Sequence, residues 1–112
     1  MILFNDFISE YRLIKKEINQ AISNVLDSGW FILGKELKKF ENLFAKYLGV
    51  KYLVGVGSGT DAITLSLMAL GIGDGDEVIT TSLTAFPTIT GILRSGAKPV
   101  LVDVLLKDGL IN

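Results

Sequence analysis

The first half of the chain carries apolar residues at the spacing of an α-helical face. Over residues 9–28 they recur at steps of four and three, at Ile14, Ile18, Ile22 and Val25. Ser9 can cap this predicted helix and Gly29 can end it. Over residues 35–48 a second apolar face consists of Leu37, Phe40, Phe44 and Tyr47. The pattern therefore predicts two amphipathic helices.

After residue 49 the pattern changes to short apolar runs separated by glycine-rich turns. Three runs predict β-strands, "KYLVGV" at 51–56, "EVITT" at 77–81 and "PVLVDV" at 99–104. Helices are predicted between them over 60–70 and 87–95. The first of these helices is apolar nearly all round, which predicts burial on more than one side. Strands that alternate with helices favour parallel pairing and a sheet covered on both faces. The predicted class is α/β, with two leading helices followed by a β-α-β-α-β order.

The composition limits the classes of function. With 112 residues the chain is the size of one small domain, and a net charge of −1 argues against nucleic-acid binding. It has no Cys and no His, which excludes Ser-His-Asp triads, thiol nucleophiles and zinc sites built from these residues. No metal site is predicted. No signal peptide or membrane-length apolar run is recognisable, so a cytoplasmic location is expected.

The segment "GVGSGT" at 55–60 joins the first predicted strand to the apolar helix. Ligands of open α/β sheets bind beyond the carboxyl ends of the strands, and a helix N-terminus favours an anion. Gly57 and Gly59 allow backbone to approach a ligand, and Ser58 and Thr60 add hydroxyl groups. These features predict a phosphate site, and a tight turn capped by Ser58 or Thr60 explains them equally well. Neither the P-loop nor the dinucleotide motif matches.

Three aromatic residues are further candidates. Phe86 lies in the loop "TSLTAFPT" at 81–88, and its ring suits stacking on a flat cofactor or covering the core. Trp30 and Phe31 lie in the loop between the two leading helices. They form either the edge of a site or interface, or an apolar staple onto the core of the domain.

Four segments, in this order, resemble the DegT/DnrJ/EryC1/StrS family of pyridoxal-phosphate-dependent sugar aminotransferases. They are "GW" at 29–30, "SGTDA" at 58–62, "GIGDGDEV" at 71–78 and "GAKPVLVDV" at 96–104. The similarity covers nearly the whole chain. It implies the aspartate-aminotransferase-like (type I) fold. Residues 1–112 would form the N-terminal portion of one large domain, with a helical arm at about 1–49 and a βαβαβ part at about 50–112.

The resemblance also implies a cofactor, pyridoxal 5′-phosphate (PLP). Gly59 and Thr60 would bind its phosphate through backbone N–H groups and the Thr hydroxyl, with Ser58 and Asp61 in the same turn. The cofactor ring would lie over the 81–88 loop. Family members often carry an aromatic residue where this sequence has Ala85, so Phe86 is the candidate for stacking. Trp30 and Phe31 would lie near the sugar-nucleotide site or the dimer seam.

The activity implied is amino transfer from glutamate to a keto-sugar linked to a nucleotide, by a homodimer with active sites at the subunit interface. The Schiff-base lysine of the family lies well downstream, and no lysine here has a matching context. The resemblance therefore implies no catalytic residue in this chain, and the 112 residues alone are expected to be inactive. Two alternatives stay open, a non-catalytic regulatory or binding protein with the PLP fold, and a plain phosphate-binding α/β domain.

Overall fold

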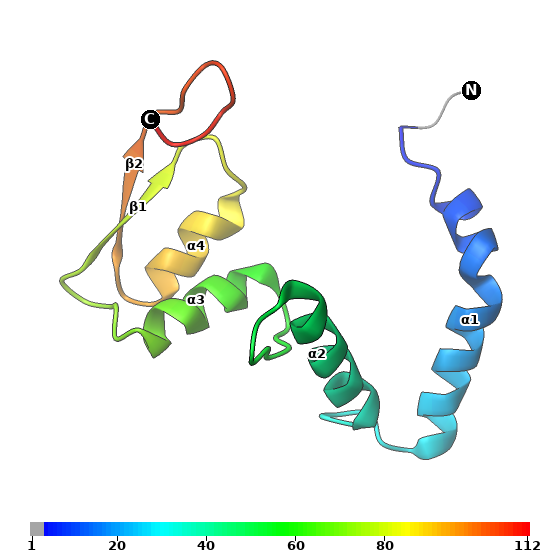
Figure 1. The fold of residues 1–112 in the computed structure, drawn as a ribbon. Helices are drawn as coiled ribbons and strands as arrows, with labels where there is room; N and C mark the ends of the chain where they lie inside the picture. Colours follow the sequence, from blue (N-terminus) through cyan, green and yellow to red (C-terminus); the bar gives the residue numbers. More distant parts are fainter. Residues whose placement is uncertain (1–3) are drawn as a thin grey trace. The chain divides into compact units, whose positions relative to one another are not determined.

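The computed structural model describes residues 4–112, which divide into two compact units at the Gly55–Val56 bond. The first unit holds helices α1 (Phe7–Ser28) and α2 (Lys35–Leu48). The second holds helix α3 (Gly59–Ala69), strand β1 (Glu77–Thr81), helix α4 (Phe86–Arg94) and strand β2 (Lys98–Val102) (Figure 1). Within residues 4–112, no helix is both long and apolar enough to cross a membrane.

Helix α1 starts two residues earlier than predicted, because Asp6 and not Ser9 caps it. The Asp6 carboxylate accepts the N–H of Ser9 at 3.1 Å, which satisfies one of the unpaired donors of the first turn. Ser9 is thus the donor to the cap, and its prediction as the cap residue is wrong. Gly29 ends the helix in the left-handed conformation, with φ of 64°, as predicted.

Helix α2 has the predicted bounds and ends at Gly49, whose φ is 69°. Three aromatic rings stack along it, with centroid distances of 5.4 Å between Phe40 and Phe44 and 6.0 Å between Phe44 and Tyr47. Ala45 is the buried residue of this helix. The aromatic rings are exposed, so the apolar face predicted from the sequence is formed but is not covered within its own unit.

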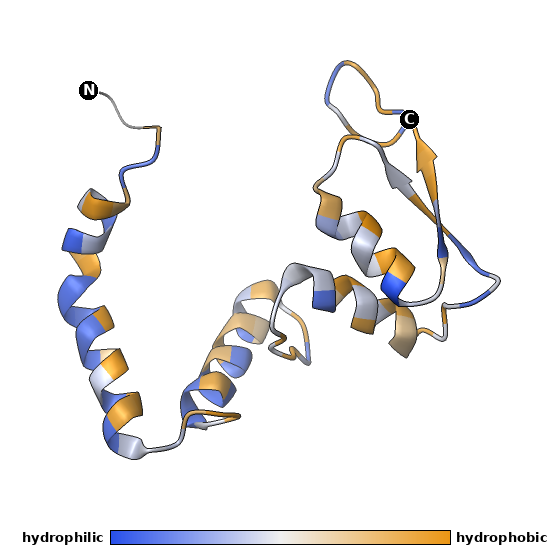
Figure 2. Cartoon of the chain, turned by 180° about the vertical axis from the view of Figure 1, so that it is seen from behind, coloured by the Kyte–Doolittle hydropathy of each residue, from blue (hydrophilic) through white to orange (hydrophobic). Residues whose placement is uncertain are grey.

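The second unit is built on a parallel pair of strands. β1 and β2 run in register from Glu77 opposite Lys98 to Thr81 opposite Val102, and α4 is the crossover between them. Helix α3 packs against α4, and Ile92 and Ala97 are the most deeply buried apolar residues. Figure 2 shows that α3 is hydrophobic or neutral over nearly its whole length.

Helix α3 packs on α4, but Leu65 and Met68 are 50% and 57% exposed, so burial on more than one side is not met within residues 4–112 and exposure of this helix is expected for the 112 residues alone. One prediction for this unit is wrong. Residues 51–56 form no strand, so the β-α-β-α-β order is not present. A strand exists through hydrogen bonds to a neighbouring strand, and within residues 4–112 this segment has none beside it.

Candidate cofactor site at the start of helix α3

Ser58 caps helix α3 and thereby fixes the end of the glycine loop. Its Oγ accepts the N–H of Asp61 at 3.1 Å and donates to Oδ2 of Asp61 at 2.9 Å. Of the two cap residues that the sequence allowed, the structure uses Ser58, and the helix begins at Gly59. The hydroxyl of Ser58 is therefore engaged with Asp61.

The next two residues present unused hydrogen-bond donors. Among residues 4–112, the backbone N–H groups of Gly59 and Thr60 have no acceptor, and the Thr60 hydroxyl makes no hydrogen bond. Such N–H groups carry the positive end of the helix dipole. A Cβ added at Gly59 would meet no atom within 4 Å, so the approach to these donors is open. Two N–H groups and one hydroxyl at a helix N-terminus fit a phosphate.

The carboxylate of Asp61 is held on both of its oxygens. Oδ2 accepts from Ser58, and Oδ1 lies 3.2 Å from Nη1 of Arg94 in the last turn of α4. The pair is solvent-accessible, with side chains 42% and 59% exposed, so its contribution to stability is small. Its electrostatic effect is local, because the guanidinium offsets a negative charge that would otherwise face an anion at this helix end. Arg94 was not identified from the sequence.

Close packing sets the first turns of α3 against α4. A Cβ at Gly91 would lie 2.9 Å from Cβ of Ile63 and 3.1 Å from the carbonyl oxygen of Thr60. The Thr64 hydroxyl lies 3.0 Å from the Thr60 carbonyl and 3.1 Å from the Gly91 carbonyl. Gly91 and Thr64 were also missed. The available signal was a glycine inside an amphipathic helix, which marks a close approach of backbone.

Phe86 opens helix α4, and its side chain is 79% exposed. It precedes Gly91 by five residues, a rise of about 7.5 Å along the helix, so it does not lie at the contact between Gly91 and α3. Stacking of Phe86 on a cofactor ring stays a prediction. At the end of β1, the Thr81 hydroxyl is buried without a partner in residues 4–112, which leaves one unsatisfied polar group beside the 81–88 loop.

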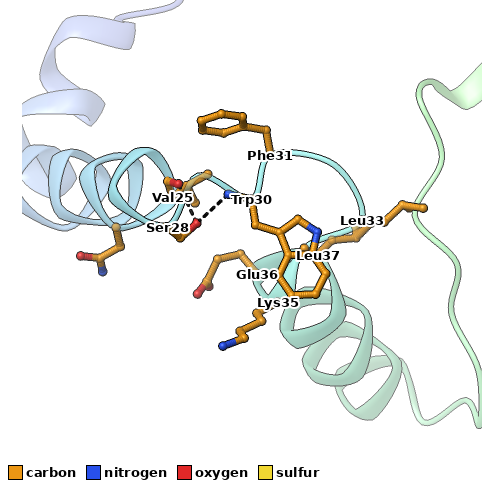
Figure 3. A pocket seen from close by; sticks show the side chains of 10 residues that line it. Val25, Ser28, Trp30, Phe31, Leu33, Lys35, Glu36 and Leu37 are labelled. Carbon is orange, nitrogen blue, oxygen red and sulfur yellow. Dashed lines mark hydrogen bonds between the residues drawn. The ribbon is translucent and has the colours of Figure 1, made fainter.

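Trp30 and Phe31 lie in the first unit, at a hollow of about 460 Å³ between the end of α1 and the start of α2 (Figure 3). The indole N–H of Trp30 donates to the carbonyl of Ile32 at 2.8 Å, and its backbone N–H donates to Ser28 Oγ at 3.1 Å. Trp30 is therefore held by its own loop. The side chain of Phe31 points away from that of Trp30 (Figure 3). The role of both residues at a substrate or subunit edge stays a prediction.

Comparison with known proteins gives consistent matches. The model of the DegT/DnrJ/EryC1/StrS aminotransferase family matches residues 12–112. A dTDP-3-amino-3,6-dideoxy-alpha-D-galactopyranose transaminase from Aneurinibacillus thermoaerophilus is 50% identical over 103 residues, which are 92% of this chain and 28% of the relative.

Two solved structures match in fold and sequence. DesV of S. venezuelae, in complex with a ketimine intermediate, has a TM-score of 0.95 and 40% identity, over 99% of this chain and 30% of that one. The E. coli GDP-4-keto-6-deoxy-D-mannose-3-dehydratase with bound hydrated PLP has a TM-score of 0.77 and 33% identity. The match covers 84% of this chain and 26% of the dehydratase. The chain thus spans less than a third of the length of each of these relatives.

Proposed function

Because the chain belongs to the DegT/DnrJ/EryC1/StrS aminotransferase family, we propose that it forms the N-terminal part of the large domain of a PLP-dependent sugar aminotransferase. The complete enzyme would transfer an amino group from a donor such as glutamate to a keto-sugar linked to a nucleotide. The transaminase of A. thermoaerophilus, which is 50% identical, supports a substrate of this class.

The observation that carries the proposal is the set of unused donors at the start of α3. The N–H groups of Gly59 and Thr60 and the Thr60 hydroxyl would bind the cofactor phosphate, while Ser58 and Asp61 hold the turn in shape. When bound, PLP supplies the electron sink for transamination. We assign no catalytic residue within residues 4–112, and propose that the lysine that carries the cofactor lies beyond residue 112.

Three further parts of the proposal concern the environment of the site. Phe86 would stack on the cofactor ring, with its exposed side chain at the start of α4 as support. Trp30 and Phe31 would form the edge of the sugar-nucleotide site or of a homodimer interface, supported by the hollow that they line. The enzyme would act in the cytoplasm.

The test uses the protein expressed with all coding sequence that follows residue 112. We expect the purified protein to bind PLP, seen as a yellow colour that dialysis does not remove. It should also transfer the amino group of glutamate to a dTDP- or UDP-linked keto-sugar. A protein that binds no PLP would overturn the proposal.

The dehydratase among the matched structures supports one alternative, in which PLP is bound and the sugar loses water without gaining an amino group. The sugar product separates the two activities, because only amino transfer yields an amino-sugar. A protein that contains PLP but neither aminates nor dehydrates a nucleotide-linked keto-sugar would favour the regulatory or binding role instead.

A further inference from the structure

Glu41 of α2 holds the chain immediately before the loop that leads into α3. Its side chain is only 14% exposed, and its Oε1 accepts the backbone N–H of Gly55 at 3.0 Å. Its other oxygen lies 3.7 Å from Nζ of Lys38. An N–H donor to an ionised carboxylate makes a charge-assisted hydrogen bond, roughly twice as strong as a neutral one. This contact anchors one defined backbone atom to α2.

The backbone at Gly55 also packs closely against the side chain of Leu37. A Cβ at Gly55 would lie 2.7 Å from Cδ1 of Leu37 and 3.7 Å from Oε1 of Glu41. Leu37 and Glu41 are four residues apart and therefore share one face of α2. Without a Cβ, the backbone at Gly55 can approach this face closely. The first glycine of "GVGSGT" thus serves packing against α2, whereas Gly59 leaves room for a ligand.

We infer that Glu41 is a positioning residue for the phosphate site, acting through Gly55; this inference rests on the proposed function. Three residue steps separate Gly55 from Ser58, where α3 is capped, so Ser58 lies within about 11 Å of the anchored point. A fixed Gly55 leaves the loop fewer conformations before a ligand binds. Phosphate binding then removes less entropy, which favours affinity.

The first test is PLP titration of the protein expressed with all sequence that follows residue 112. Glu41→Ala should raise the Kd for PLP by up to about tenfold, the limit reached if ordering the released loop costs as much as the lost hydrogen bond contributed. Glu41→Gln keeps an acceptor oxygen and should stay within about threefold of the wild type. Glu17→Ala removes an exposed carboxylate from α1 and should leave the Kd unchanged.

A second test uses size instead of charge. Gly55→Ala places a methyl group against Leu37 and should raise the Kd for PLP. In the double variant Gly55→Ala/Leu37→Ala the overlap is removed, and the Kd should return toward that of Leu37→Ala alone. Because this pair leaves Glu41 in place, it tests the anchored point even if Glu41→Ala does not fold.

A third measurement needs no cofactor. Hydrogen exchange at the Gly55 amide should be slow in the wild type, faster in Glu41→Ala and unchanged in Glu17→Ala. A wild type that binds no PLP, with these exchange rates as expected, would overturn the proposed function and with it the role of Glu41 in cofactor binding. PLP affinity equal in wild type, Glu41→Ala and Gly55→Ala, measured well below their melting temperatures, would overturn the inference alone.

Discussion

Two threonines one turn apart on α3 show how the surroundings of a hydroxyl group decide its use. Thr60 offers a hydroxyl with no partner among the described residues, beside the unused N–H of Gly59. The Thr64 hydroxyl already donates to the carbonyl oxygens of Thr60 on α3 and Gly91 on α4. The sequence shows the same residue type at both positions, and only the structure separates the hydroxyl without a partner among residues 4–112 from the one in a packing contact.

We therefore expect Thr60→Val to raise the Kd for PLP about tenfold, because a hydrogen bond to a charged phosphate is lost. The melting temperature of the cofactor-free protein should not change. Thr64→Val is the matched control, and should lower the free energy of unfolding by about 1 kcal/mol with a smaller effect on Kd. Equal effects of the two variants on PLP affinity would contradict the assignment.

Asp6 provides a pH-dependent contact. Hydrogen bonds from the hydroxyl and the backbone N–H of Ser9 hold the pKa of the Asp6 carboxyl below its usual value of 3.8. A carboxyl with a lowered pKa in the folded state stabilises that state above its usual pKa. This contribution is lost as the pH falls below about 3.8 and through the folded-state pKa. The cap of α1 is thus expected to weaken only in strong acid.

The measurement is an NMR titration of the Asp6 carboxyl. Ser9→Ala removes the hydroxyl donor, the larger of the two causes, and should move the pKa of Asp6 back toward 3.8. Ser23→Ala, on the same helix but far from the cap, is the control. A pKa that Ser9→Ala leaves unmoved would show that the hydroxyl contact does not form in solution.

At the scale of elements, the contact between α3 and α4 depends on Gly91. Replacement by Ala would gain about 0.5–1 kcal/mol from helix propensity. The added Cβ would overlap Ile63 and the Thr60 carbonyl, and overpacking of this kind costs about 1–3 kcal/mol. We expect the overlap to win, so Gly91→Ala should lower the free energy of unfolding by about 1–2 kcal/mol in chemical denaturation.

Two companion variants make this prediction specific. Gly59→Ala adds the same methyl group where no atom lies within 4 Å, and should leave stability nearly unchanged. Ile63→Ala should not rescue Gly91→Ala, because the Cβ of residue 63 and the Thr60 carbonyl both remain. Rescue by Ile63→Ala would mean that the outer atoms of that side chain cause the strain.

The elements differ in how far the sequence predicts them. Apolar spacing and glycine stops predict α2 at its observed bounds, because both signals are local. Residues 77–81 likewise form the predicted strand, β1. Residues 51–56 have the same apolar, β-branched character and form no strand, since strand formation depends on a partner that local sequence does not specify.

The candidate site divides in the same way. Glycine spacing and hydroxyl groups predict a phosphate-binding turn at residues 58–60, and within residues 4–112 Gly59 and Thr60 present donors without an acceptor, whereas the Ser58 hydroxyl is engaged with Asp61. The contacts made by Glu41 and Arg94 join residues 14 and 33 positions apart in the chain. No short motif encodes such pairs, so they become visible only once the chain is folded.

At the scale of the whole molecule, the main feature is the large amount of apolar surface that stays exposed to solvent. Ile79 on β1 is 63% exposed and Leu101 on β2 is 57% exposed, although both belong to a strand pair that reads as fully buried from its sequence. The stacked rings of α2 and the outer sides of α3 are exposed as well. Exposed apolar patches of this kind mark interaction sites or surfaces prone to aggregation.

The 112 residues expressed alone should therefore bind a hydrophobic fluorescent dye and self-associate as their concentration rises. The double variant Ile79→Thr/Leu101→Thr keeps residues that favour strands while removing apolar area, so it should bind less dye and associate more weakly. Dye fluorescence and sedimentation velocity measure the two effects. A monomer with a sharp thermal transition and no dye binding would show that these faces are stable in water. The exposed strands and helices would then not be surfaces that the rest of a larger enzyme covers.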